Sequence, residues 1–299
     1  MKKITVLTSL YKCERYLQAY FDRVRQIDNQ EEIEILLLHN APSQEELDIV
    51  QQNISELPCI RHIIISKLEG LYITWNRGIH LAEGKYICIW NVDDIRFSNS
   101  LSLQAETLEQ NPDILLTYCD FYLMFQYGNI SNEKVINEDF SLKASAFFNT
   151  HQIGCFPMWR KTLHEQLGYF DEQFFLVADF DFQIRIARTG KIKKTEGVLG
   201  AYLDDVPEKL SSNSKRQIIE RNTLYLRYAI WEYLNWFTLF SVYKKQTFMI
   251  KNGNKWIPVS SVFESYRSYC KKRYPKLFKS VLSQPRGLAA FVKHCLLNK

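Results

Sequence analysis

The chain has 299 residues, of which 46% are hydrophobic and 24% charged, with only 11 glycines and 8 prolines. This composition excludes a low-complexity or disordered protein, and the length allows one large domain or two smaller ones. The formal charge of +5 hides an asymmetry: residues 215–299 hold 17 basic and three acidic residues, a balance of +14, whereas residues 1–214 have a balance of −9. We therefore expect two parts with different roles, the second facing an anionic partner.

The seven cysteines are scattered, without a Cys-x-x-Cys pair or a histidine at ligand spacing. This pattern argues against a zinc site and against a disulfide framework. The apolar run after Met1 is too short for a secretory signal, and no segment approaches the ~18–20 uninterrupted apolar residues of a membrane span. A reducing cytoplasm is the expected environment.

Strands and helices are predicted to alternate in the first part of the chain. Ser43 and Glu46 form a capping-box pattern that starts one of the helices. The strands are uninterrupted Ile and Leu runs, which favours a parallel sheet covered by helices on both faces. The strands are expected at residues 4–9, 33–38, 60–65 and 86–90, and the helices at 14–27, 43–54 and 71–82.

The fourth predicted strand ends in the polar sequence Asn91-Val-Asp93-Asp94. Open α/β sheets bind ligands at the carboxyl ends of their strands. Adjacent carboxylates there suit Mg²⁺ or Mn²⁺ and, through the metal, a diphosphate. The alternative is an ordinary solvated turn.

Beyond Asp94 the pattern changes. A helix is expected over residues 98–110, and strands over 114–119 and 121–127 are separated only by Asp120. An aromatic-rich helical stretch is expected from about residue 216 to 243.

Several short motifs resemble family-2 glycosyltransferases of the GT-A fold. In that family the strand-end loops read Pro-Thr-Tyr-Asn, Asp-Asp-Gly-Ser and Asp-x-Asp, with a Gly-x-x-x-Ala-Arg-Asn-x-Gly helix before the last. The matching stretches are Val6-Leu-Thr-Ser-Leu-Tyr11, Ile35-Leu-Leu-Leu-His-Asn40, Gly70-Leu-Tyr-Ile-Thr-Trp-Asn-Arg-Gly78 and Trp90-Asn-Val-Asp-Asp94. A later block, Leu167-Gly-Tyr-Phe-Asp-Glu172 with Ala178-Asp-Phe-Asp181, Arg185 and Gly190, is similar to the one that carries the family's catalytic base.

The resemblance covers residues 3–212 and implies an α/β GT-A fold, a Rossmann-like nucleotide-binding mixed sheet flanked by helices. Residues 1–214 would form this domain, with 1–97 as the nucleotide-binding half and 98–214 as the acceptor-binding half. Residues 215–299 would form a helical C-terminal extension.

The resemblance implies that Asp93 and Asp94 bind Mn²⁺ or Mg²⁺, with the choice between the two acids left open. Asn91 stands where the family has its first Asp and is expected to contact the nucleotide. Asp179 matches the general base, although Ala178 replaces the neighbouring Glu. Asp181 is the rival base, or a structural acid paired with Arg185; alternatively, both acids simply begin a helix.

The resemblance also implies nucleotide contacts for Thr8, Tyr11, Asn40, Asn76, Asn91 and Asp93. Asn40 replaces the family's uracil-reading acid, so uridine is favoured only modestly. Asn76 has an alternative as a helix-packing amide. Five histidines lack paired spacing and are interpreted as structural, with His151 near the expected acceptor loop kept as a candidate site residue: His39, His62, His80, His151 and His164.

The basic tail leaves two interpretations open. Bases interleaved with aromatic residues over 266–299 suit an anionic membrane surface, whereas residues 216–245 suit a helical lid over the acceptor site. Nucleic acid is not an expected partner, because no nucleic-acid motif is present.

The predicted function is inverting, metal-dependent transfer of a sugar from a nucleotide-diphosphate sugar to a glycan or lipid-linked acceptor. Family habit suggests bacterial surface polysaccharide synthesis in the cytoplasm, peripheral at the inner face of the membrane if the tail binds lipid. The alternatives are a sugar-nucleotide nucleotidyltransferase and a non-catalytic carbohydrate-binding or scaffold protein.

Overall fold

The computed structural model describes residues 2–141, 153–204, 214–228 and 249–258, together with Ser268 and Lys272. The chain divides into two compact units. Unit 1 comprises Met1–Ser141, Ala146–Gln166 and Thr189–Val206, and unit 2 comprises Leu142–Ser145, Leu167–Arg188 and Pro207–Lys299. The domain boundary predicted at residue 214 stays a prediction.

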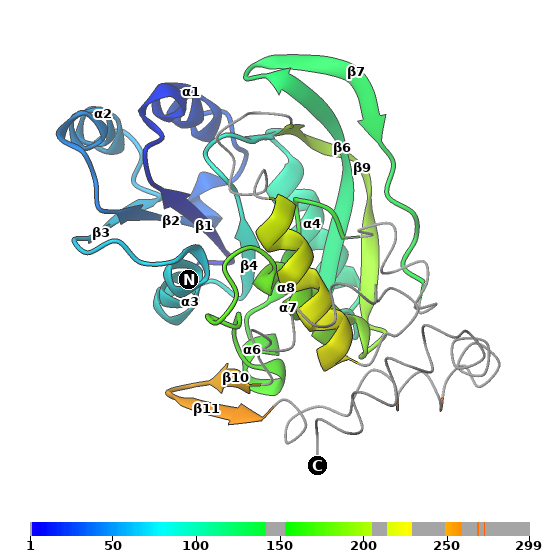
Figure 1. Ribbon diagram of the computed structural model, residues 1–299. Coiled ribbons are helices and arrows are strands. Elements are labelled where there is room, and N and C mark those ends of the chain that lie inside the picture. Colours follow the sequence, from blue (N-terminus) through cyan, green and yellow to red (C-terminus); the bar gives the residue numbers. More distant parts are fainter. Residues whose placement is uncertain are drawn as a thin grey trace. The chain divides into compact units, whose positions relative to one another are not determined.

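The first half of unit 1 alternates strands and helices, as the sequence predicts (Figure 1). Its strands pair in parallel in the order β3-β2-β1-β4. A 3₁₀ turn, η1, precedes β2. The elements are β1 (Ile4–Leu10), α1 (Glu14–Val24), η1 (Gln30–Glu32), β2 (Ile33–Asn40), α2 (Gln44–Ile54), β3 (Ile60–Ile65), α3 (Leu71–Leu81) and β4 (Tyr86–Ile89).

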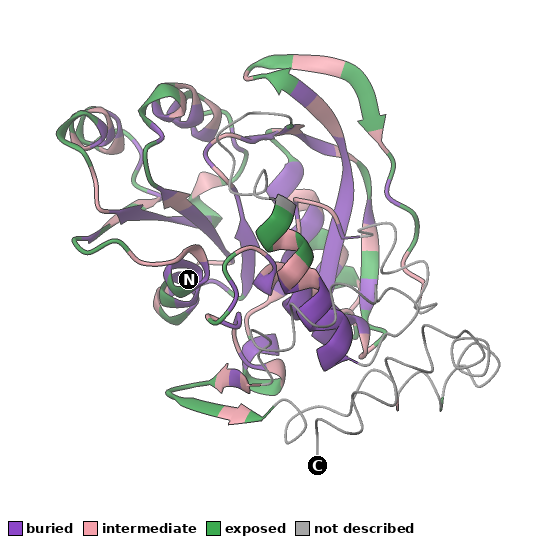
Figure 2. Cartoon of the chain, in the orientation of Figure 1, coloured by how far each residue is buried: buried purple, intermediate pink, exposed green. Residues whose placement is uncertain are grey.

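Helices cover both faces of these strands because the central strands are apolar on both faces. Val6 and Ile35 belong to the core that contains the buried residues of α1. On the opposite face α3 lies so close that a Cβ on Gly78 would be 2.7 Å from Leu38 Cδ1 and 2.8 Å from Leu7 Cδ2. The helix can pack here because position 78 has no side chain, and Figure 2 shows the resulting burial of the central strands.

The second half of unit 1 extends the sheet with antiparallel and parallel strands. The full order is β3-β2-β1-β4-β8-β6-β9-β5, with β7 paired to β6. Thus the sheet is mixed, as expected. The elements are β5 (Ile95–Arg96), α4 (Ser100–Gln110), β6 (Leu116–Gln126), β7 (Asn129–Val135), β8 (Met158–Arg160), α6 (Leu163–Leu167) and β9 (Ile192–Leu203).

The two strands predicted around Asp120 are one strand, β6. Asp120 does not end it because its carboxylate finds partners from other parts of the chain: Oδ1 accepts a hydrogen bond from Asn137 N at 2.9 Å and lies 2.7 Å from Lys194 Nζ. The pairing of β6 with β9 shifts register on both sides of Asp120. The polar residue therefore produces an irregularity instead of a turn.

The described part of unit 2 contains α7 (Ala178–Ala187), α8 (Ser214–Arg227) and a hairpin of β10 (Met249–Asn252) with β11 (Lys255–Pro258). Helix α8 corresponds to the start of the stretch predicted helical over 216–243. The rest of that stretch, His151 and nearly all of the tail over 266–299 lie outside the described residues. In the part of the chain that the structure describes, no helix is long and apolar enough to cross a bilayer.

Candidate active site

The turn after β4 brings Asn91 and Asp94 into contact. Asn91 Nδ2 donates to Asp94 Oδ2 at 3.0 Å, and the backbone N–H of Leu203 donates to Asp94 Oδ1 at 3.2 Å. The side chain of Trp90 also donates to the backbone oxygen of Asp94 at 3.0 Å. With both carboxylate oxygens hydrogen-bonded and 1% of the residue exposed, Asp94 ties the turn to the end of β9.

Asp93, in contrast, is only partly buried in the same turn. Its carboxylate and that of Asp94 lie in electrostatic range of Tyr127, where burial and these acids raise the tyrosine pKa to about 12. Asp93 therefore presents negative charge at the carboxyl end of β4, whereas both carboxylate oxygens of Asp94 accept hydrogen bonds within the fold.

The donor set of the turn suits a cation that is shared with a ligand. Asp93 offers carboxylate oxygens, and Asn91 keeps its amide oxygen because only its nitrogen is used towards Asp94. Across the described ranges, no group of three or more His, Cys, Asp or Glu side chains is gathered to hold a metal. Mg²⁺-type sites often consist of one or two carboxylates plus phosphate oxygens and water, so these residues fit a metal that arrives with a diphosphate.

Of the residues predicted at the end of β1, one is buried and one exposed. Thr8 is fully buried and its hydroxyl is 2.8 Å from the hydroxyl of Tyr20, so it packs inside the unit. Tyr11 is 43% exposed, and Lys12 Nζ lies 5.4 Å from the centroid of its ring. Tyr11 is thus available for stacking on a ligand, whereas Thr8 is not exposed to one.

Asn40 ends β2 beside this loop, since β1 and β2 are paired. Its side-chain Nδ2 donates to the backbone oxygen of Glu69 at 2.9 Å, and its Oδ1 accepts from the backbone N–H of Glu69 at 3.0 Å. Nδ2 also donates to Thr74 Oγ1 at 3.0 Å. Both amide protons have protein partners, which leaves one acceptor lone pair for a nucleotide base. Asn76, on α3, is 3% exposed.

A buried cluster that the sequence did not reveal joins the loops after β1 and β2 with β3. His39 Nδ1 is 3.0 Å from His62 Nε2, and His39 Nε2 is 3.5 Å from Glu46 Oε2. Glu46 in turn accepts the backbone N–H of Cys13 at 2.8 Å. Only the strand register could have revealed the pair: Leu37 is opposite His62, so His39 and His62 project from the same face of neighbouring strands.

Lowering the pH is expected to destabilise the chain through this histidine pair. Burial lowers the pKa of His39 below 6.5, partly offset by Glu46, and burial together with His39 lowers the pKa of His62. Below 6.5 the unfolded chain therefore binds more protons than the folded one, and stability falls as the pH falls through this range. Urea midpoints between pH 8 and 5 measure the effect.

The control for this titration is His62→Gln, which removes one titrating ring. Its urea midpoint should depend less on pH than that of the unaltered chain. Equal pH slopes for the unaltered chain and His62→Gln would contradict the assignment.

In unit 2 the candidate base Asp179 lies in the first turn of α7 and is partly exposed. Its Oδ1 accepts a hydrogen bond from the backbone N–H of Phe180 at 2.8 Å. Acids are favoured in the first turn of a helix, where backbone N–H groups are unpaired. The carboxylate is thereby held at the helix end and not in the core.

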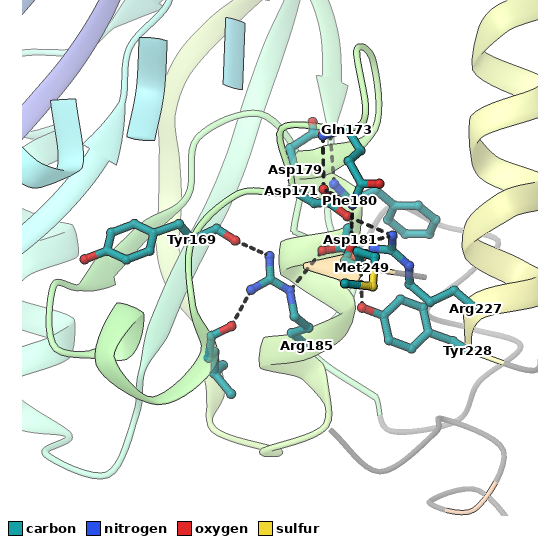
Figure 3. A network of polar contacts seen from close by, with 11 residues as sticks. Tyr169, Asp171, Gln173, Asp179, Phe180, Asp181, Arg185, Arg227, Tyr228 and Met249 are labelled. Atoms are coloured by element: carbon teal, nitrogen blue, oxygen red, sulfur yellow. Dashed lines mark hydrogen bonds and ion pairs between the residues drawn. The ribbon is translucent and has the colours of Figure 1, made fainter. Parts of the chain in front are cut away.

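Asp181 is fully buried and belongs to an ionic network (Figure 3). One carboxylate oxygen is 2.9 Å from Arg185 Nε, and the other is 2.8 Å from Arg227 Nη1 and accepts from the Tyr228 hydroxyl at 2.7 Å. Burial alone would raise its pKa, but Arg185 and Arg227 outweigh burial and hold the pKa of Asp181 below its usual value. These contacts support the interpretation of Asp181 as a structural acid that pairs with Arg185.

Arg227 completes the network from α8 and was not predicted from the sequence. Its Nη2 is 2.8 Å from Asp171 Oδ2, so one guanidinium joins two buried carboxylates. The pKa of Asp171 is raised because burial outweighs the attraction of Arg227. The network fixes α7 to α8 and to the segment before α7, and thus holds the helix that carries Asp179.

The family model and the two relatives that follow are all described as glycosyltransferases. Residues 5–168 match the model described as "Glycosyl transferase family 2". The uncharacterized glycosyltransferase MJ1057 of Methanocaldococcus jannaschii is 26% identical over 215 residues, which are 71% of this chain and 74% of that protein. The uncharacterized glycosyltransferase YwdF of Bacillus subtilis is 26% identical over 57% of this chain and 64% of its own length.

TarS and a mannosyltransferase are similar to this chain in fold at low sequence identity. A TarS fragment from S. aureus in complex with UDP-GlcNAc has a TM-score of 0.62 at 15% identity, covering 80% of this chain and 73% of that one. The chain spans 39% of the longer TarS structure. A mannosyltransferase from Pyrobaculum calidifontis, in complex with GDP-Man and Mn²⁺, has a TM-score of 0.56 at 11% identity, covering 99% of this chain and 80% of that one. These similarities confirm the predicted GT-A fold.

Proposed function

Because the chain belongs to glycosyl transferase family 2 and is a glycosyltransferase, we propose that it transfers a sugar from a nucleotide-diphosphate sugar with inversion and with a divalent metal. The observation that carries the proposal is the turn after β4, in which Asp93 is partly exposed at the carboxyl end of the strand, whereas Asp94 is buried with both carboxylate oxygens hydrogen-bonded. The proposed acceptor is a glycan or a lipid-linked acceptor. Family membership favours sugar transfer over the alternative prediction, nucleotidyl transfer that makes a sugar nucleotide.

We assign the metal contact to Asp93, with the amide oxygen of Asn91 beside it, and a structural role to Asp94. Mn²⁺ or Mg²⁺ bound there would offset the charge that develops on the departing nucleoside diphosphate. Tyr11 stacks on the base, and the edge of the base is read near Asn40. UDP-sugars are the first donors to test, since the TarS fragment of similar fold is in complex with UDP-GlcNAc. GDP-sugars are the second, since the mannosyltransferase of similar fold is in complex with GDP-Man.

The chemical step we propose is attack of an acceptor hydroxyl on the anomeric carbon. The bond from that carbon to the diphosphate oxygen breaks, and the hydroxyl proton passes to the carboxylate of Asp179. The partly exposed position of Asp179 at the start of α7 supports this role, and the burial of Asp181 with two arginines supports a different role for that acid.

The metal assignment is tested by comparing Asp93→Asn with Asp94→Asn. Asp93→Asn should keep the melting temperature of the free chain but lose the extra stabilisation that Mn²⁺ adds to UDP or GDP, because ligand binding stabilises by mass action. Asp94→Asn should lower the melting temperature of the ligand-free chain, because one buried carboxylate oxygen that accepts a hydrogen bond is lost. The expected decrease in the free energy of unfolding is about 1–3 kcal/mol.

A thermal-shift panel of nucleoside diphosphates with and without Mn²⁺ measures both effects. The assignment of Asp93 fails if its Asn variant responds to Mn²⁺ as the unaltered chain does. A chain that binds UDP or GDP with Mn²⁺ but never cleaves a UDP- or GDP-sugar in the presence of acceptor extracts would instead support the scaffold alternative.

The setting of the reaction is also a proposal. We place it in surface polysaccharide synthesis on the cytoplasmic side of a membrane, with the basic stretch over 266–299 on anionic lipid. Its support is the charge of residues 215–299, with 17 bases against three acids. Removal of residues 266–299 should abolish sedimentation with anionic vesicles and preserve nucleotide binding.

A further inference from the structure

Two loops of the nucleotide-binding half contain residues in a conformation that suits glycine. Lys12, in the loop after β1, has a φ of 50°, and Ala41, directly after β2, has a φ of 45°. Left-handed backbone is unfavourable for a residue with a Cβ atom and persists only where the surrounding structure holds it. Both loops therefore need an external restraint.

The carboxylate of Glu46 bonds both loops at once. Its Oε1 accepts the backbone N–H of Cys13, the residue after Lys12, at 2.8 Å. Its Oε2 accepts the backbone N–H of Ser43, two residues after Ala41, at 2.9 Å. One side chain thus restrains the strained segment of each loop.

Glu46 is built rigidly into the fold. It is 1% exposed, and its own N–H donates to Ser43 Oγ at 3.1 Å in the capping box of α2. Burial alone would raise its pKa, but the N–H groups of Ser43 and Cys13 outweigh burial and lower the pKa of Glu46. The carboxylate is therefore ionised at neutral pH, when it accepts hydrogen bonds most strongly.

The two loops flank the predicted base-binding residues. Tyr11 precedes Lys12 and is exposed, and Asn40 precedes Ala41. The far side of the second loop is held independently by the bonds of Asn40 to the backbone of Glu69. The backbone N–H of Ala41 also donates to the oxygen of Ile65 at 2.8 Å. Glu46 supplies a further restraint, which connects the loop of Tyr11 to the loop of Asn40.

We propose that Glu46 is a positioning residue for the donor nucleotide. It holds the loops after β1 and β2 in the conformation that receives a nucleoside diphosphate, without itself touching that ligand. This inference rests on the proposed function, because it assumes that a nucleotide binds at these loops. Binding to a preformed site avoids the cost of ordering the loops, so loss of the restraint should weaken nucleotide affinity.

The experiment is calorimetric titration of the full chain with UDP, and separately GDP, in the presence of Mn²⁺. Glu46→Gln should weaken the tighter of these ligands about tenfold or more, since its amide cannot accept from both backbone N–H groups. The matched control is Glu45→Gln, which removes one charge from the same first turn of α2 at an exposed position and should change affinity less than about twofold. Equal affinities for the two variants would overturn the proposal.

A second substitution separates positioning from a general loss of structure. Glycine adopts left-handed backbone without steric cost. Ala41→Gly combined with Glu46→Gln should therefore recover part of the lost affinity, although it restores no hydrogen bond. A double variant as weak as Glu46→Gln would show that conformation is not what Glu46 supplies.

Hydrogen exchange of the unaltered chain covers the case in which Glu46→Gln does not fold. The amides of Cys13 and Ser43 should exchange slowly before any nucleotide is added, because both already donate to Glu46. Fast exchange of these amides that slows only on nucleotide binding would overturn the preformed restraint. Failure of the unaltered chain to bind either nucleotide would overturn the proposed function, whereas normal binding by Glu46→Gln would overturn only the role of Glu46.

Discussion

Replacing Asp179 with asparagine is expected to reduce the turnover number for sugar transfer by about 10²–10⁴-fold, the usual contribution of a general base. The amide keeps the shape of the side chain and an oxygen that accepts the Phe180 N–H. It cannot take a proton from an acceptor hydroxyl. Release of nucleoside diphosphate from the sugar nucleotide that binds best, with acceptor extract present, measures the effect.

The same variant should leave nucleotide affinity and the free energy of unfolding nearly unchanged, because Asp179 is partly exposed. Asp181→Asn, two residues further on the same helix, is the matched control. It should act on stability, costing about 3–5 kcal/mol, because Arg185 and Arg227 lose their shared buried counter-charge. Wild-type turnover in Asp179→Asn would remove it as the base.

Replacing Arg227 with glutamine is expected to lower the free energy of unfolding by about 3–5 kcal/mol, since removing one member of a buried ionic network leaves uncompensated charge. Asp171 and Asp181, both with fully buried side chains, would lose the guanidinium that joins them. The guanidinium also donates to the backbone oxygen of Met249 at 3.2 Å, so the β10 strand loses a contact as well. Urea unfolding at pH 7 measures the change.

The chain offers a matched control on the same helix. Arg216 Nε is 2.9 Å from Glu220 Oε1, but its side chain is 49% exposed, so Arg216→Gln should cost about 1 kcal/mol or less. Asp171→Asn combined with Arg227→Gln should be less destabilised than Arg227→Gln alone, because one buried charge of each sign is removed. Equal losses for Arg216→Gln and Arg227→Gln would contradict the importance assigned to the network.

Arg227 connects the helix that carries the proposed base to a later part of the chain. The family-model match ends at residue 168, and Arg227 on α8 lies beyond it, as do the acids Asp171 and Asp181 with which it pairs. A chain cut at residue 214 would leave Asp171 and Asp181 without this partner. The helix that carries the proposed base therefore depends on a part of the chain beyond the family match.

Much of the first half of the fold could be predicted from the sequence. Strands β1 to β4 and helices α1 to α3 follow from apolar runs and helical spacing, which are properties of neighbouring residues. The capping box of Ser43 and Glu46 was predicted for the same reason and is present. The strand ending in acids, and its place in an ordered series of motifs, indicated the family.

Asp120 marks the limit of local patterns. A polar residue between two apolar runs normally indicates a break, yet here β6 continues, because Asn137 and Lys194 supply partners for its carboxylate. Those partners come from distant parts of the chain, so no local window contains them.

The sequence by itself determined the family, the order of the elements and the small set of acids and amides at the strand ends. Only the tertiary structure showed that Asp94 differs from Asp93, and Asp181 from Asp179, in burial and in hydrogen-bond partners. In the sequence each pair consists of two aspartates in one short motif. It also brought Glu46 to Cys13, 33 residues away along the chain. The physical reason is that burial and hydrogen-bond partners decide what a carboxylate can do, and both are set by segments that meet only when the chain folds.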